Sequence, residues 1–292
     1  MSSTSTADMP PHFTPPGCLS LCWLTVRGAH PLDHIAAAAE AGFNAVGLRL
    51  VPPTPGDPLI PLIGDEPLVR DVLASLADRQ ISVLDVETVW IGPDIDIVAL
   101  RPAFELAQRL GCRNLLTMGN DSEASRLTSN FARLCEEAAR FGLDVGMEFS
   151  AYSAVKSIQH AERLVRAAAR PNGRILVDAL HLARSGGSPA DVAALDRGLL
   201  AYCQLADARG PTPTTDDALR DEARGGRYLP GEGDLPLQAL LAVLPPGLPM
   251  GVEAPTARDA DLSVADRARL AAVATRKFFQ TVRIQREASP ES

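Results

Sequence analysis

Short apolar runs alternate along the chain with longer segments in which apolar residues recur every three or four positions. The short runs predict buried strands, and the longer segments predict amphipathic helices. The predicted strands span residues 18–26, 44–51, 81–91, 112–119, 143–150, 174–180, 199–208 and 249–255. The predicted helices span residues 31–42, 66–80, 97–111, 124–142, 156–170, 188–198, 235–245 and 263–282.

Each predicted strand is therefore followed by a predicted helix, and the series has no interrupting linker. Gly42, Gly111 and Gly142 stand where a helix should end before the next strand, as C-cap glycines do. Eight strand–helix units in a row favour an α/β fold made of a single (β/α)8 TIM barrel. An open, doubly wound sheet stays an alternative, because periodicity does not show whether a sheet closes.

The two ends of the chain differ from this pattern. Residues 1–16 are rich in Ser, Thr and Pro and bury little apolar surface, so we predict a flexible N-terminal tail. Residues 285–292 predict a short C-terminal tail in the same way. The barrel itself is expected to span residues 17–284.

Composition and charge exclude several classes of partner. The chain is 46% hydrophobic but only 4% aromatic, and its formal net charge is −8, which opposes binding to a nucleic-acid phosphate backbone. We find neither an apolar run long enough to span a membrane nor a secretory signal, so we expect a cytoplasmic protein that does not bind membranes. Its five cysteines are odd in number and lack paired metal-ligand spacing, which predicts reduced core residues.

Polar side chains end four consecutive predicted strands in the second half of the chain. They are Glu148, Asp178, Gln204 and Glu253. In a barrel, the carboxyl ends of the strands meet at one face, where the loops that carry the chemistry converge. Any one of these residues could form a salt bridge or cap a strand end, but charged groups at buried positions are usually paired or bound to metal.

A divalent metal ion would explain why these groups gather. Three carboxylates at one barrel mouth repel one another unless protons or a cation neutralise them. Carboxylate and amide oxygens suit a hard ion better than zinc, so we predict one divalent metal, Mn²⁺ first, with Mg²⁺, Co²⁺ or Zn²⁺ as alternatives. His181, three residues after Asp178, could then face a substrate; alternatively, Asp178 caps a helix and His181 packs beside it.

Further candidates for substrate binding lie at other loops. Arg49 and Glu87 come near the ends of the second and third predicted strands, where they could hold a substrate or pair with each other. Residues 209–234 form an irregular segment that is too long for a simple connector and predicts a lid. It contains Arg224 and Arg227, as substrate contacts or as solvated loop charges.

The chain resembles the xylose isomerase-like TIM barrels, a superfamily of sugar phosphate isomerases and epimerases that also contains endonuclease IV. The resemblance runs from about Gly17 to Thr281 and rests on the motifs "GMEFS", "VDALHLARSGG", "QLADA" and "GVEAP". It implies that Glu148, Asp178, Gln204 and Glu253 bind one metal and that His181 contacts the substrate. It also makes Arg224 and Arg227 candidates for an arginine that faces the substrate.

The resemblance has one departure, because the third metal position is usually His and is Gln204 here. A similar Gln occurs in bacterial 3-dehydroshikimate dehydratases of this superfamily. Dimers and tetramers are common in the family, so a homo-oligomer is also an expectation by resemblance.

These residues lead to a hypothesis about the reaction. A metal-held carbonyl lowers the pKa of the neighbouring carbon-bound proton, and the resemblance implies that Glu148 and Glu253 transfer that proton. We therefore predict a metal-dependent isomerase or epimerase acting on a small polyhydroxylated carbonyl substrate. The alternative is a dehydratase (lyase) of the 3-dehydroshikimate type. A non-catalytic binding barrel and a DNA-repair endonuclease are the remaining hypotheses; the acidic charge opposes the latter.

Overall fold

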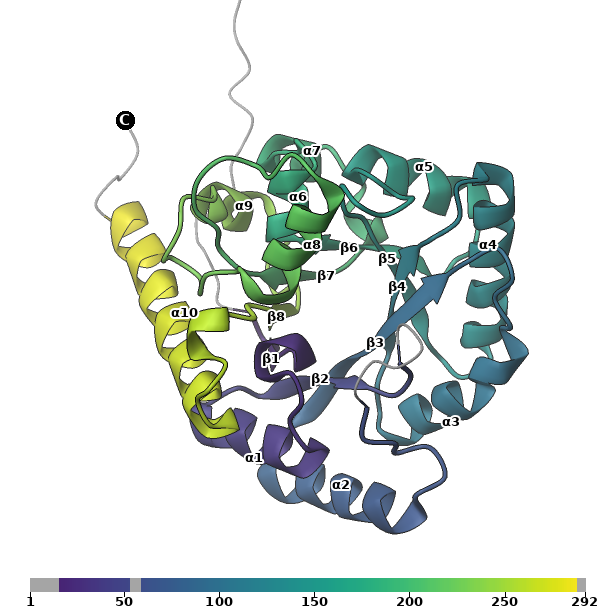
Figure 1. Cartoon of the computed structure of the whole chain (residues 1–292), viewed down its shortest axis with the longest axis horizontal. Helices are drawn as coiled ribbons and strands as arrows, with labels where there is room; N and C mark the ends of the chain where they lie inside the picture. The colour runs from purple at the N-terminus through teal and green to yellow at the C-terminus, as the bar shows by residue number, and fades with distance from the viewer. Residues whose placement is uncertain (1–15, 53–58, 288–292) are drawn as a thin grey trace, which may run out of the picture.

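Eight parallel strands close into one barrel, in the order in which they occur along the chain (Figure 1). The computed structural model describes residues 16–52 and 59–287. The strands are β1 (Leu19–Leu21), β2 (Ala45–Arg49), β3 (Ser82–Ile91), β4 (Asn114–Gly119), β5 (Asp144–Glu148), β6 (Gly173–Asp178), β7 (Leu200–Leu205) and β8 (Met250–Val252). Pairing of β1 with β8 completes the ring, which confirms the predicted TIM barrel and excludes the open sheet.

Helices surround the ring and follow the strands in sequence (Figure 1). They are α1 (Pro31–Ala41), α2 (Glu66–Arg79), α3 (Arg101–Arg109), α4 (Ala124–Ala139), α5 (Ile158–Ala168), α6 (Ala179–Arg184), α7 (Pro189–Ala193), α8 (Asp216–Gly225), α9 (Leu237–Val243) and α10 (Val264–Glu287). Four 3-10 turns complete the set: η1 (Trp23–Val26), η2 (Val98–Leu100), η3 (Arg197–Leu199) and η4 (Ala257–Asp259). None of the helices in the described ranges is apolar over enough length to cross a bilayer.

Two differences from the sequence predictions concern loops and ends. The segment predicted as an irregular lid contains α8, which Thr215 caps through its side chain and which has acidic residues in its first turn. Helix α10 continues to Glu287, past the predicted boundary at residue 284. The predicted tails lie mostly outside the described residues, which exclude 1–15 and 288–292.

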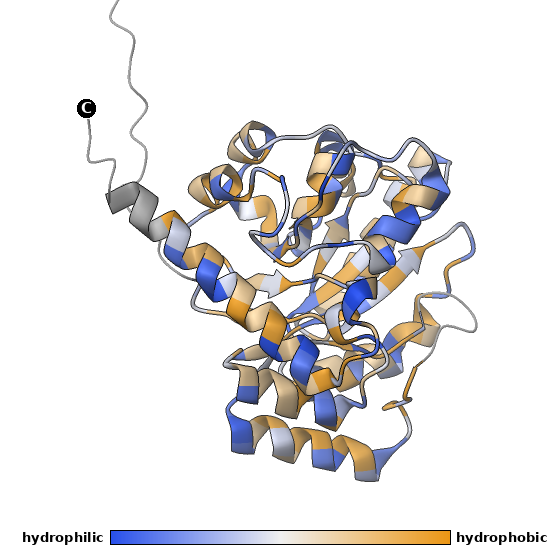
Figure 2. Cartoon of the chain, turned by 60° about the vertical axis from the view of Figure 1, so that its left-hand side comes forward, coloured by the Kyte–Doolittle hydropathy of each residue, from blue (hydrophilic) through white to orange (hydrophobic). Residues whose placement is uncertain are grey.

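The last helix of the barrel packs beside the first. Helix α10, brought forward in Figure 2, alternates hydrophilic and hydrophobic residues and packs against α1. Arg276 donates a hydrogen bond from Nη1 to the carbonyl oxygen of Ala41 at 2.8 Å, near the C-cap Gly42, whose φ of 83° suits glycine. The helical layer is thus continuous across the junction of first and last units.

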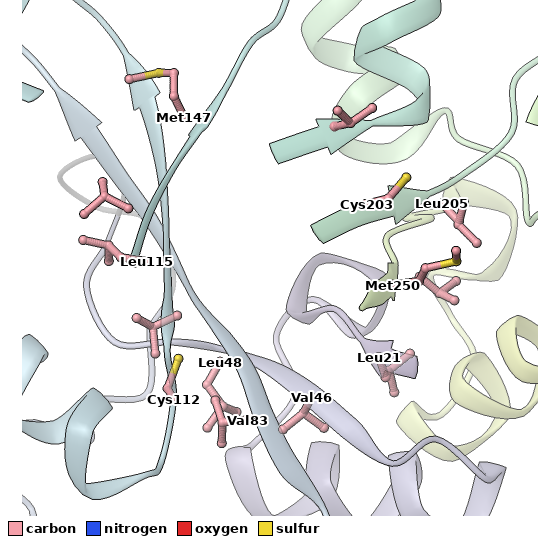
Figure 3. Close-up of a cluster of buried hydrophobic side chains, with 14 of the residues drawn as sticks. Leu21, Val46, Leu48, Val83, Cys112, Leu115, Met147, Cys203, Leu205 and Met250 are labelled. Atoms are coloured by element: carbon pink, nitrogen blue, oxygen red, sulfur yellow. The ribbon is translucent and has the colours of Figure 1, made fainter. Parts of the chain in front are cut away.

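The strands present alternate residues to two separate cores. In β2, Val46 and Leu48 belong to the large cluster between strands and helices, whereas Ala45 belongs to a small cluster inside the barrel. Figure 3 shows members of the outer cluster on strands from several sides of the ring. Because side chains alternate along a strand, the residues of even offset from Ala45, ending at Arg49, face the barrel interior.

The same alternation directs the strand-end candidates inward. On β6 the outer-cluster residues are Ile175 and Val177, so Leu176 and Asp178 point inward. On β7, Tyr202 lies in the inner cluster, and Gln204 follows it by two positions. The site residues are therefore the top layer of the barrel interior, above a packed apolar layer.

Candidate functional site

A cavity opens at the carboxyl ends of the strands. Its lining comes from loops and strands on all sides of the ring and includes Arg49, Glu87, Glu148, His181, Arg224, Arg227 and Glu253. The four residues predicted for substrate binding, three arginines and one glutamate, thus line one cavity together with the three predicted catalytic residues. The cavity is at the face where a TIM barrel carries its chemistry.

The four predicted metal ligands occupy equivalent places on four adjoining strands. Glu148 and Asp178 are the last residues of β5 and β6, Gln204 is in β7, and Glu253 directly follows β8. All four are buried. The structure therefore brings together the residues that the sequence singled out, because each lies at an inward position of its own strand.

Asp178 caps a helix with one carboxylate oxygen and turns the other toward the site. Its Oδ1 accepts a hydrogen bond from the backbone N–H of His181 at 2.9 Å, which makes it the N-cap of α6. Its Oδ2 lies 2.6 Å from Nη1 of Arg227. One oxygen thus fixes the helix that carries His181, and the other faces the charged site.

Arg227 occupies a position that the sequence did not predict. Its guanidinium bridges two predicted ligands, with Nη1 2.6 Å from Asp178 Oδ2 and Nη2 3.1 Å from Glu253 Oε2. It also donates from Nε to the carbonyl of Ala223, in the last turn of α8, at 2.8 Å. A buried guanidinium is stable only when carboxylates and carbonyls satisfy it, and this site supplies both.

Burial and charge set the protonation of the acidic groups. Burial, with the charges of Glu253 and Asp178, raises the pKa of Glu148 well above its ordinary value. Burial raises the pKa of Glu253 to about 8, although Arg227 lowers it in part. Burial also opposes ionisation of Asp178, but Arg227 and His181 outweigh that effect and hold its pKa below the ordinary value.

The donor set fits a divalent cation. Glu148, Asp178 and His181 each offer a ligand atom, and these atoms lie within 4.8 Å of one another. Glu148 Oε1 and Gln204 Oε1 are buried and have no hydrogen-bond partner among the described residues. The Gln204 amide donates from Nε2 to Glu253 Oε1 at 3.1 Å, which leaves its carbonyl oxygen available. Unpartnered buried oxygens of this kind are what a hard cation binds.

His181 is buried in the cavity wall and is therefore not a solvent-exposed residue. Burial lowers the pKa of its imidazole to about 4, so the ring is neutral at neutral pH. Its Nε2 lies 3.9 Å from Glu148 Oε1, and the ring of Tyr152 meets it edge to face at 5.6 Å between centroids. A neutral imidazole in this place can exchange a hydrogen bond with a bound oxygen.

Arg49 and Glu87 both pair with each other and line the cavity. Their strands are in register at these residues, and Arg49 Nη2 lies 3.4 Å from Glu87 Oε2. The Arg49 guanidinium also lies over the Trp23 ring, 3.9 Å from its centroid. The ion pair therefore coexists with a place in the cavity, as the sequence left open.

Sequence reasoning missed three aromatic residues at this site. Trp90 and Tyr152 line the cavity, and Trp23 supports Arg49 from η1. Trp23 and Trp90 are the two tryptophans of the chain; Trp23 begins η1 just after β1, and Trp90 lies near the carboxyl end of β3. Their rarity in a chain with 4% aromatic residues was the one available signal.

The buried carboxyl groups predict how stability depends on pH. Burial raises the pKa of Glu253 and of Asp85, deeper in the barrel, to about 8. Unfolded carboxyls lose their protons near pH 4, so at higher pH the folded state binds more protons than the unfolded state. Stability of the metal-free protein should therefore fall as pH rises through 8.

Urea unfolding in the presence of a chelator, at pH 6.5 and pH 8, checks this expectation. Buried His34 and His181 oppose this trend, because their unfolded forms release about half a proton each above pH 6.5. That effect favours folding by about 0.4 kcal/mol per histidine, which is less than the loss of more than about 1 kcal/mol expected from each carboxyl over the same range. We expect a lower midpoint at pH 8, and a smaller difference in Asp85→Asn. An equal or higher midpoint at pH 8 would contradict the conclusion that burial raises the pKa of these carboxyl groups.

Comparison with known proteins gives the family and the fold. Residues 35–276 match the family model described as xylose isomerase-like TIM barrel. No curated protein matched the chain. Among solved structures, a xylose isomerase-like TIM barrel/4-hydroxyphenylpyruvate dioxygenase fusion protein has a TM-score of 0.76 and 21% identity, covering 95% of this chain. The chain spans 45% of the length of that fusion protein.

Two further structures are similar over their full length. The probable 3-DHS dehydratase AsbF from Bacillus anthracis has a TM-score of 0.71 and 16% identity, covering 89% of this chain and 98% of its own. D-allulose 3-epimerase from Methylomonas sp. has a TM-score of 0.66 and 17% identity, covering 91% and 98%. Because the family model matches most of the sequence, this chain belongs to the xylose isomerase-like TIM barrel family.

Proposed function

We propose that this chain is a divalent-metal-dependent enzyme that removes a proton next to a carbonyl of a small polyhydroxylated substrate and returns it to give an isomer or epimer. One observation carries the proposal: Glu148, which ends β5, and Glu253, which directly follows β8, line the same cavity. Two carboxyl groups on different sides of a bound carbon atom are what removal and return of a proton require.

The predicted ligands would hold the metal within this arrangement. Glu148, Asp178, Gln204 and Glu253 would bind it through oxygen atoms, with Mn²⁺ as the first choice. When bound, such an ion polarises a substrate carbonyl and stabilises the negative charge that develops when the neighbouring proton leaves.

The remaining work belongs to side chains of this chain. Glu148 takes the proton from one face of the substrate carbon, and Glu253 returns one from the other face. His181, which is neutral, holds a substrate hydroxyl or carbonyl oxygen beside Glu148. Arg227 stays close to Asp178 and Glu253 and adds positive charge where oxygen becomes negative.

A dehydratase is the second candidate, and Gln204 favours it. Gln replaces the usual His at the third ligand position, as in the bacterial 3-dehydroshikimate dehydratases that the sequence resembles. The similarity to the probable 3-DHS dehydratase AsbF is consistent with this candidate. The first step would be the same. The hydroxyl on the carbon next to the carbanion would then leave as water, with a proton from a carboxyl group of the site, instead of the proton returning to carbon.

A substrate screen in deuterated water separates these functions. The purified chain, supplied with Mn²⁺, is incubated with keto sugars and with 3-dehydroshikimate. We expect deuterium at the carbon next to the carbonyl together with a changed configuration, and loss of this activity with chelator. Loss of water from 3-dehydroshikimate would instead support the dehydratase. Absence of both exchange and water loss across the screen would contradict the proposal and favour a binding barrel.

A further inference from the structure

The cavity is lined by more arginines than the pairs around the predicted metal ligands account for. Arg27, Arg49 and Arg224 line it in addition to Arg227. Arg227 is already paired with Asp178 and Glu253, and the Glu87 carboxylate is the nearest acidic partner of Arg49. The positive groups of the cavity are therefore only partly compensated among the described residues.

Arg49 is the best placed of these residues to bind a ligand. Its side chain is 9% exposed, yet its contact with Glu87 is long, at 3.4 Å. Its Nε is buried and has no hydrogen-bond partner among the described residues. A guanidinium has five N–H donors, and leaving buried donors unpaired is unfavourable, so this group is suited to donate hydrogen bonds to a ligand oxygen.

The surroundings of Arg49 fix its orientation. The Trp23 ring lies under the guanidinium at 3.9 Å, and Glu87 itself accepts a hydrogen bond from the backbone N–H of Trp23 at 3.1 Å. Gly47 is at the inward position below Arg49, next to the side chain of Asp85. A Cβ atom at this position would lie 2.5 Å from Asp85 Oδ1, so any larger residue there would displace that carboxylate. A planar guanidinium held in this way can present two parallel N–H groups to one oxyanion.

The position of Arg49 in the ring determines which part of a substrate it meets. Arg49 ends β2, whereas Asp178 ends β6, four strands further round a closed barrel of eight. Glu148 ends β5 and Glu253 follows β8, so the segment of the ring from β5 to β8 has its middle across the mouth from Arg49. A small molecule whose reacting carbonyl is near Glu148 and Glu253 extends its other end toward Arg49.

We propose that the substrate carries an oxyanion, a carboxylate or a phosphate ester, at the end remote from its reacting carbonyl, and that Arg49 binds it with Arg27 and Arg224 at the rim. This inference rests on the proposed function and narrows its substrate class from neutral sugars to anionic ones. It applies to both candidate reactions, because each needs a carbonyl at the other end of the cavity.

The test compares three ligands that differ only at one carbon. D-Fructose ends in a hydroxymethyl group at C6, D-fructuronate in a carboxylate, and D-fructose 6-phosphate in a phosphate ester. Binding to the full chain with Mn²⁺ is measured by tryptophan fluorescence, since both tryptophans lie at or beside the cavity. We expect at least one anionic ligand to bind about tenfold or more tightly than D-fructose.

Variants then locate the contact. Arg49→Gln should weaken binding of the preferred anion about tenfold or more and leave binding of D-fructose within about twofold. Arg27→Gln and Arg224→Gln, both at exposed positions, should weaken binding of the anion less than Arg49→Gln does. These two variants leave the Arg49–Glu87 pair undisturbed. Arg269→Gln, on the outer face of α10 with a side chain 63% exposed, is the matched control and should change nothing.

The outcomes separate this inference from the proposed function. The preferred end group, carboxylate or phosphate, identifies which oxyanion the site takes. Tighter binding of D-fructose than of both anions, or equal weakening of charged and neutral ligands in Arg49→Gln, would overturn the inference even if neutral sugars are turned over. Anion binding that depends on Arg49 without any turnover would support the inference and contradict the proposed function.

Discussion

Replacing Glu148 with Gln should abolish turnover, with a loss of about a thousandfold or more in kcat. The change preserves size and removes the carboxylate that we assign as the base. Glu148 is buried, and its Oε1 has no hydrogen-bond partner among the described residues, so the amide can fit without breaking a contact at that oxygen. The fold should therefore survive the substitution while proton removal does not.

The measurement has to separate the base from the metal ligand, because we assign both roles to Glu148. Turnover and wash-in of solvent deuterium are followed at increasing Mn²⁺, with bound metal determined on the same samples. Glu162→Gln, at a surface pair with Arg166, is the control and should keep full activity. Full turnover by Glu148→Gln with metal bound would contradict the assignment of Glu148 as the base.

Replacing Arg227 with Met should destabilise the metal-free protein by about 3–5 kcal/mol, the usual cost of breaking a buried ion pair. The guanidinium is buried between Asp178 and Glu253, and methionine cannot neutralise either carboxylate. The variant therefore leaves two of the four predicted metal ligands, Asp178 and Glu253, without their positive partner. A divalent cation at those ligands should replace part of that compensation.

Thermal unfolding with chelator and with Mn²⁺ tests this second expectation. We expect Mn²⁺ to raise the Tm of Arg227→Met by more than it raises the Tm of the parent chain. Arg184→Met is the matched control, because Arg184 is also buried but pairs with Glu222 at 2.7 Å and not with a predicted ligand. That variant should also lose stability, but Mn²⁺ should not restore it preferentially. Equal effects of Mn²⁺ on both variants would argue against a cation at Asp178 and Glu253.

The order of elements could be predicted because it depends on local patterns. Apolar runs and helical periodicity follow from how neighbouring residues share a face, and the structure confirms eight strand–helix units. The limits were at the ends of elements, where capping and packing decide. The first strand proved to be only Leu19–Leu21, because the chain turns into η1 at Trp23. The predicted lid contains α8, whose cap at Thr215 was overlooked.

The candidate site could be predicted in part for the same reason. A polar residue at the end of an apolar run is visible in the sequence, and the rule that strand ends converge in a barrel brings Glu148, Asp178, Gln204 and Glu253 together. Contacts between distant segments were not visible in this way. The bridge from Arg227 to Asp178 and Glu253, and the stacking of Arg49 on Trp23, join residues that no sequence spacing relates.

The sequence by itself thus determined the succession of strands and helices and the residues that each strand carries to its end, since both follow from short-range periodicity. Only the tertiary structure decided that the sheet closes, which groups share the cavity and which charges compensate one another. Closure and charge pairing depend on the relative positions of whole elements, such as α8 beside the ends of β6 and β8. Those positions result from packing across the entire barrel.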